Sequence, residues 1–359
     1  MRRKIAVLTS AMGLGTYNPA LVLCRKLEKK GWDCLFFLYE ELFCEEKRNN
    51  LKKNKDACHN NHKIARMYLK MPKGHINNSI NEEKSEELVK FWCQERIDIF
   101  IVFSGFWSGT VKKYADIAGA GNIYLFKVHM DCNVSPSWQK WEAKYTHEID
   151  LWPLMDCSPQ VTLSIKKETI RLLKERTSRF VMHGGGWGIG IDYSIAQKLV
   201  GRNYEVDIIN LYKEKTSTEE GIEDYYLGEW EPFRKKDGTF EFPPLHNRDN
   251  SVIHESDYYP AYNLYTDAMG IISKPGGGTL LDSFSSCTPL IYLEPIAEHE
   301  YANAEYWEKN KFGISLEKWE KSNFSLEILE ELQCNLINRR KVMLELDYYI
   351  DKMIGEKYD

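Results

Sequence analysis

The chain has 359 residues, of which 43% are apolar and 13% aromatic, a composition typical of a packed globular protein with room for two domains. Its formal net charge is -5, with both signs spread along the chain, which gives no electrostatic support for a nucleic-acid partner. The nine cysteines stand singly, a pattern that favours reduced thiols in the cytoplasm over a disulfide framework or a zinc site. No apolar stretch approaches transmembrane length, and the run at residues 5–8 is too short for a signal peptide.

A glycine turn between a predicted strand and a predicted helix opens the chain. The apolar run at residues 5–8 predicts a buried strand, and residues 19–30 carry apolar side chains at helical spacing. Gly13 and Gly15 lie between them, but a lone G-x-G is weak evidence for dinucleotide binding because no third glycine follows at the right place. Residues 32–38 predict the next strand, so this region has the β–α–β order of an open parallel sheet.

Two titratable residues directly follow another predicted strand in the first half of the chain. Residues 123–128 predict a buried strand, and His129 and Asp131 come just after it. Open α/β sheets bind ligands at the carboxyl ends of their strands, so either residue is a candidate general base. The pKa of histidine lies near neutrality, and that of Asp131 would approach neutrality if burial raised it. The alternative is structural, with His129 packed in the core and Asp131 capping a helix.

Two glycine-rich loops follow predicted strands in the second half. The strand predicted at 179–182 leads into Gly185 and Gly186, and the strand predicted at 271–272 leads into a second loop and a helix at 280–287. The second loop consists of Gly276, Gly277, Gly278 and Thr279. Glycines let phosphates approach the backbone, and a helix N-terminus offers unpaired N–H donors to an anion. Asp282, on the first turn of that helix, is placed to accept hydrogen bonds from a ribose diol; the alternative is a connector with an exposed aspartate.

The stretch 271–304 resembles the nucleotide-sugar signature of inverting GT-B glycosyltransferases. These include the enzyme that adds N-acetylglucosamine to the peptidoglycan lipid precursor and the UDP-glycosyltransferases of natural products. The resemblance implies that the glycine loop receives the diphosphate, that Asp282 holds the ribose, and that His299 and Glu300 contact the donor sugar. At the first glycine turn the family commonly has a histidine base, where this chain has Thr16. Thr16 occupies the family's catalytic position, but threonine cannot act as a base at neutral pH. The identity of the general base therefore stays open.

The resemblance also implies a fold. We expect an α/β chain of the GT-B type, in which two Rossmann-like domains face each other across a cleft. The acceptor-side domain is expected over residues 1–158 and the nucleotide-sugar domain over 159–345, with an insertion at 212–257 that the family does not explain. Residues 326–354 are expected to be helical. The last part, 346–359, is expected to pack as a helix on the first domain.

These observations predict a glycosyltransferase that moves a sugar from a nucleoside diphosphate, most simply UDP, to a small-molecule, lipid or glycan acceptor. Retaining relatives carry a Glu-x7-Glu pattern whose first acid would fall at Lys274, so inversion is favoured. No cofactor is expected beyond the nucleotide-sugar co-substrate, and no metal site, since His59 and His62 lack a third ligand. The sequence gives no oligomeric state. Two alternatives remain: a nucleotide-sugar 2-epimerase of the same fold, or a non-catalytic protein that only binds the nucleotide sugar.

Overall fold

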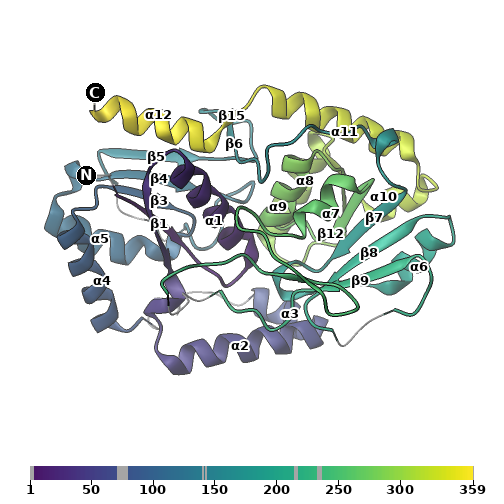
Figure 1. Ribbon diagram of the computed structural model, residues 1–359, viewed down its shortest axis with the longest axis horizontal. Helices are drawn as coiled ribbons and strands as arrows, with labels where there is room; N and C mark the ends of the chain where they lie inside the picture. The colour runs from purple at the N-terminus through teal and green to yellow at the C-terminus, as the bar shows by residue number, and fades with distance from the viewer. Residues whose placement is uncertain are drawn as a thin grey trace.

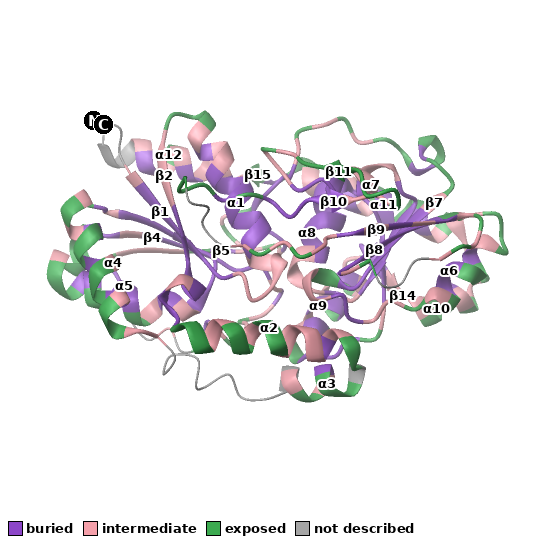
Figure 2. Cartoon of the chain, turned by 60° about the horizontal axis from the view of Figure 1, so that its bottom comes forward, coloured by how far each residue is buried: buried purple, intermediate pink, exposed green. Residues whose placement is uncertain are grey.

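The computed structural model describes residues 4–70, 80–139, 141, 144–213, 217–232 and 237–358. The chain forms two α/β halves side by side, each built around its own sheet (Figure 1). The central strands of both sheets are buried, whereas the helices on the outside expose one face to solvent (Figure 2). Among the described helices, none combines the length and apolar character needed to cross a bilayer. The exact boundary between the halves, expected after residue 158, stays a prediction.

The N-terminal half contains a five-stranded parallel sheet in the order β2-β1-β3-β4-β5. Its strands are β1 (Lys4–Thr9), β2 (Asp33–Leu38), β3 (Ile99–Val102), β4 (Tyr124–Val128) and β5 (His147–Leu151). Its helices are α1 (Leu14–Lys29), α2 (Glu45–Asn60), α3 (His62–Lys70), α4 (Glu82–Glu95) and α5 (Ser108–Ala118). Strand β5 is not evident in the sequence because it is an edge strand with mostly polar residues and lacks an apolar run.

Helix α1 begins five residues earlier than its apolar pattern predicts. It starts at Leu14, and Pro19 lies inside the helix instead of at its first position. A proline this close to the start removes only the hydrogen bond to the carbonyl of Gly15, which the remaining length of the helix outweighs. Gly15 and Thr16 therefore belong to the first turn of α1, and the unpaired N–H groups of that turn lie next to the carboxyl end of β1.

The C-terminal half contains an eight-stranded sheet in the order β11-β10-β9-β8-β7-β12-β13-β14, parallel except for β10 and β11. The strands are β7 (Arg179–His183), β8 (Glu205–Asn210), β9 (Ile222–Tyr226), β10 (Leu245–His246), β11 (Val252–Ile253), β12 (Gly270–Ser273), β13 (Leu290–Tyr292) and β14 (Gly313–Ser315). The helices are α6 (Tyr193–Val200), α7 (Tyr262–Asp267), α8 (Gly277–Ser286), α9 (Glu298–Lys309), α10 (Leu316–Lys321) and α11 (Leu326–Lys341).

The segment 212–257 is built into both halves. Strands β9, β10 and β11 extend the C-terminal sheet at one edge. Between β9 and β10 the chain reaches α1, where the hydroxyl of Tyr17 donates a hydrogen bond of 2.7 Å to the carbonyl of Glu241. The Phe240 ring packs against Phe36, with ring centroids 4.9 Å apart. This part of the chain therefore links the two sheets instead of standing out as a surface loop.

The C-terminal helix lies against the N-terminal half, and the helix predicted over 326–354 is interrupted. Helix α11 ends at Lys341, and α12 (Leu346–Tyr358) follows only after the short strand β15 (Leu344–Glu345), which pairs with β6 (Val161–Thr162). Helix α12 then runs along α1 (Figure 1), where the indole of Trp32 donates to Asp351 at 2.8 Å. The partner of β15 lies about half the chain upstream, so helical spacing alone could not reveal the interruption.

Helices α2 and α3 cross from the N-terminal half to the C-terminal half, below the two sheets in the view of Figure 1. Cys58 and Ala65 form a small apolar cluster with Ile189 and Ile296 of the C-terminal half. Arg66 adds an ion pair of 2.7 Å to Glu294. A region that is polar and lysine-rich in the sequence thus supplies a contact between the two halves.

Candidate functional site

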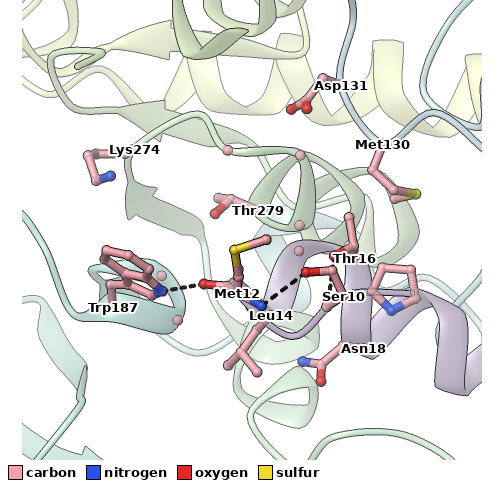
Figure 3. Close-up of a pocket in the computed structure, with 18 of the residues that line it drawn as sticks. Ser10, Met12, Leu14, Thr16, Asn18, Met130, Asp131, Trp187, Lys274 and Thr279 are labelled. Carbon is pink, nitrogen blue, oxygen red and sulfur yellow. Dashed lines mark hydrogen bonds between the residues drawn. The ribbon is translucent and has the colours of Figure 1, made fainter. Parts of the chain in front are cut away.

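A cavity of about 510 Å³ lies between the two halves, at the carboxyl ends of strands from both sheets. Its wall includes the first turn of α1, the Asp131 loop after β4, the glycine loop after β7, and the glycine loop that starts α8. Figure 3 shows Thr16, Asp131, Trp187, Lys274 and Thr279 around this one space. The fold therefore brings together candidate residues that are up to 284 positions apart, from Thr16 to Glu300 (300 − 16 = 284).

Glycines allow three loops to approach each other at this cavity. A Cβ at Gly278 would lie 2.8 Å from the Cα of Gly15, across the interface between the halves. A Cβ at Gly186 would lie 2.9 Å from the Leu14 side chain, and one at Gly277 would lie 2.1 Å from the Met130 carbonyl oxygen. Side chains at these positions would force the loops apart. The first turns of α1 and α8 thus meet at the cavity, where their unpaired N–H groups and positive dipole ends favour an anion.

The buried carboxylate of Glu40 holds the loop before α1 in place. This carboxylate accepts hydrogen bonds from the Ser10 hydroxyl at 2.5 Å and from the N–H groups of Ala11 and Met12, each at 3.0 Å. Burial raises the pKa of Glu40, although these donors oppose the shift. From the other half, the indole of Trp187 donates to the Met12 carbonyl (Figure 3). The turn is therefore held in place from both halves of the protein.

Thr16 lines the cavity, at the position where the resembled family has its base. Its hydroxyl donates to the Ser10 carbonyl at 2.8 Å, and its own carbonyl accepts from the Thr9 hydroxyl at 3.0 Å. Its hydroxyl proton is therefore already used to hold the turn. This geometry agrees with the chemical argument that Thr16 cannot deprotonate an acceptor.

Asp131 and His129 end up in different environments. Asp131 lines the cavity, and its Oδ1 accepts a hydrogen bond of 3.0 Å from the Asn303 side chain. His129 is not part of the cavity wall; it stacks on Trp152 at 4.0 Å, and its Nε2 lies 2.6 Å from Asp150. The structure places His129 in the core, which corrects the expectation that it could meet an acceptor. Of the two candidate bases, Asp131 alone faces the cavity.

Asp282 lines the cavity, and it is buried instead of exposed. The hydroxyl of Tyr259 donates to its Oδ1, and burial raises the pKa of Asp282 to about 7. The expected ribose contact therefore requires a ligand to share this carboxyl group with Tyr259. Thr279 lies one turn earlier on α8 and also lines the cavity. Its side chain makes no hydrogen bond to any of the described residues.

Lys274, His299 and Glu300 form the wall beside the second glycine loop. The ammonium of Lys274 lies 3.0 Å from one oxygen of Glu300, whose other oxygen accepts from the Ile296 N–H at 2.7 Å. Burial would raise the pKa of Glu300, but Lys274 and this N–H group hold it below its ordinary value. Glu300 is thus engaged at both oxygens, in supporting Lys274 and the start of α9, while the partly buried His299 lies beside it at the cavity wall.

His183 is a cavity residue that the sequence analysis did not single out. It ends β7, lines the cavity and is 6% exposed. Its Nδ1 accepts from the Gly185 N–H at 3.1 Å, and within the described residues its Nε2 has no hydrogen-bond partner. Burial and the nearby Lys274 lower the pKa of His183 to about 4, so the ring is neutral and carries its proton on Nε2. The sequence feature that could have identified His183 is its position at the end of a predicted strand, directly before a glycine loop.

Comparison with solved structures shows to which class of fold the chain belongs. No protein-family model matches the chain. The crystal structure of glycosyltransferase VinC in complex with DTDP matches with a TM-score of 0.60 and 10% identity, over 98% of both chains. The glycosyltransferase SsfS6 from Streptomyces sp. SF2575 with thymidine diphosphate (TM-score 0.58, 11% identity) and MurG from Acinetobacter baumannii (0.57, 12%) match over 99% of this chain and 100% of theirs. The protein therefore has the GT-B glycosyltransferase fold, as the sequence predicted.

A short stretch is also similar to a characterised enzyme. Over 43 residues, the chain is 44% identical to the processive diacylglycerol beta-glucosyltransferase of Staphylococcus aureus. This alignment covers 12% of this chain and 11% of that protein. The similarity thus concerns a local sequence, whereas the structural matches concern the whole fold.

Proposed function

We propose that the protein is a glycosyltransferase that moves a sugar from a nucleoside diphosphate to an acceptor, with inversion and without a metal ion. The observation that carries the proposal is the meeting of the first turns of α1 and α8 at one cavity, beside Lys274. Two helix N-termini and an ammonium group match the charge of a diphosphate. UDP is the proposed nucleotide, and the nine free cysteines support a cytoplasmic location.

In the proposed reaction, an acceptor oxygen attacks the anomeric carbon of the donor sugar while the bond from that carbon to the diphosphate oxygen breaks. The negative charge that develops on the diphosphate is stabilised by the N–H groups of the α8 first turn and by Lys274. His183 Nε2 is a neutral donor in the same wall. The acceptor proton passes to Asp131, which faces the cavity from the N-terminal half.

The test starts with nucleotide binding. Calorimetric titration with UDP, dTDP and GDP should show binding of one of them, and Thr279→Val, which removes a hydroxyl but keeps the shape, should weaken it by about 1 kcal/mol. An unfolding curve of the variant controls for damage to the fold. If none of the three nucleotides binds, the proposal is wrong.

Incubation with nucleotide sugars then distinguishes transfer from its alternatives. Transfer predicts a glycosylated product only when an acceptor is present. Epimerisation of the donor sugar without any acceptor would identify a 2-epimerase instead. Nucleotide binding with no turnover across a broad panel of acceptors would identify a non-catalytic binding protein.

A further inference from the structure

A second cavity, of about 690 Å³, adjoins the first on the other side of the contact between Met12 and Trp187. The two cavities share wall residues, among them Met12, Leu14, Trp187 and Leu227. One side of the second cavity is formed by α2 and the other by residues 211–212 and 227–232. The proposed donor site makes no use of this space. A ligand in it would be separated from the proposed donor site by these shared side chains.

Two cationic side chains on α2 face this cavity without forming an ion pair to any of the described residues. Arg48 and Lys55 are seven residues apart, so they lie on the same face of the helix, two turns from each other. Both are partly buried, and neither makes an ion pair with any of the described residues. The Nε of Arg48 is buried and has no hydrogen-bond partner among them. Burial lowers the pKa of Lys55, which nearby acids oppose only in part.

None of the carboxylates in the wall forms an ion pair with Arg48 or Lys55 among the described residues, although Asp56 and Glu231 favour the charged form of Lys55. Glu40 is occupied by the Ser10–Met12 loop, Asp56 accepts from the Tyr212 hydroxyl at 2.7 Å, and Glu231 pairs with Lys52 at 3.1 Å. The remaining acids of the wall, Glu45 and Glu229, are exposed to solvent. Partly buried positive charge without a partner is costly, and an arranged pair of cations is suited to binding an anionic group.

Because the proposed function needs an acceptor site next to the donor sugar, and the inference rests on that function, we propose that the second cavity binds an acceptor carrying an anionic group, a phosphate or a carboxylate. Arg48 and Lys55 hold this group. The rest of the acceptor lies along the Trp230 and Trp187 side chains toward the donor cavity. The arrangement selects charged acceptors over neutral ones, because a neutral molecule leaves both cations uncompensated.

The test uses three sugars of similar size: glucose 6-phosphate, glucuronate and glucose. Each is titrated into the protein saturated with UDP, so that the diphosphate site is already filled, and binding is followed by NMR or calorimetry. Wild-type protein is expected to bind one or both of the anionic sugars and to bind glucose at least tenfold more weakly. The variants Arg48→Gln and Lys55→Gln should each weaken binding of the anionic sugar about tenfold. Lys53→Gln, on the same helix but exposed and outside the cavity, is the matched control and should change nothing.

The outcomes separate this inference from the proposed function. Equal binding of glucose and the charged sugars, or unchanged binding in Arg48→Gln and Lys55→Gln, would overturn the anionic acceptor site even if UDP binds normally. If UDP fails to bind, the same titrations without UDP show whether the cavity is an anion site unrelated to sugar transfer. UDP affinity that is equal in wild type and all variants is the expected result, because none of the three positions lines the donor cavity.

Discussion

The approach of α8 to the Met130–Asp131 loop depends on the absence of a side chain at Gly277. A Cβ at this position would lie 2.1 Å from the Met130 carbonyl oxygen and 2.8 Å from its carbon. Ordinary contact begins near 3.4 Å, so Gly277→Ala requires a separation of at least 1.3 Å (3.4 − 2.1). The atoms in conflict belong to the backbone and not to the end of a flexible side chain, so the loop itself must move.

The cost of this movement should appear more in ligand binding than in stability. Overpacking costs about 1–3 kcal/mol, while replacing glycine by alanine in a helix returns up to about 1 kcal/mol. We therefore expect Gly277→Ala to lose about 0–3 kcal/mol in the free energy of unfolding. Displacing the first turn of α8 should also remove one or two charge-assisted hydrogen bonds to a diphosphate, so that UDP binds about ten- to a hundredfold more weakly.

The neighbouring Gly276 provides the matched control. A Cβ at Gly276 meets nothing within 4 Å, and its φ of −77° suits any residue. Denaturant unfolding and calorimetric titration with UDP are measured on wild type, Gly276→Ala and Gly277→Ala. Gly276→Ala should behave like wild type in nucleotide affinity. If Gly277→Ala binds UDP as tightly as Gly276→Ala, the loops do not meet as described and the reasoning fails.

Three further predictions follow from single residues. Asp131→Asn should lower kcat by at least about a hundredfold while UDP affinity stays unchanged, and retained turnover would exclude Asp131 as the base. Burial raises the pKa of Asp282 to about 7, so the folded state binds the proton more tightly than the unfolded state does. The free energy of unfolding of the wild type should therefore fall as pH rises from about 4 to about 7. An equally steep fall in Asp282→Asn, measured by unfolding at each pH, would contradict this. Ile350→Ala, at a fully buried position of α12, should cost about 2–5 kcal/mol, whereas Tyr348→Ala, 52% exposed on the same helix, should cost under about 0.5 kcal/mol.

Local patterns in the sequence predicted the β–α–β order of open parallel sheets and several elements, and the resemblance of residues 271–304 added the GT-B arrangement of two such domains. The strand predicted at 205–210 has those bounds as β8, and the run at residues 5–8 lies within β1 (Lys4–Thr9). The glycine loops at 185–186 and 276–278 both line the cavity. These features are local, because a strand, a glycine turn and a helix start each depend on a few neighbouring residues.

Contacts between distant residues decided the rest. Whether Asp131 or His129 faces the cavity depends on Trp152 and Asp150, which pack His129 into the core. Tyr259 reaches Asp282 from another element, and its hydroxyl occupies a carboxyl group that the sequence assigned to a ribose. Neither contact leaves a periodic signal in the sequence.

The same reason explains the second cavity. The polar spacing of α2 indicates a solvated helix, and only its packing against residues 211–212 and 227–232 turns Arg48 and Lys55 toward an enclosed space. The sequence by itself therefore determined the two-sheet fold and the glycine loops. The tertiary structure decided which side chains face a ligand, because burial and electrostatic environment depend on partners far away in the chain.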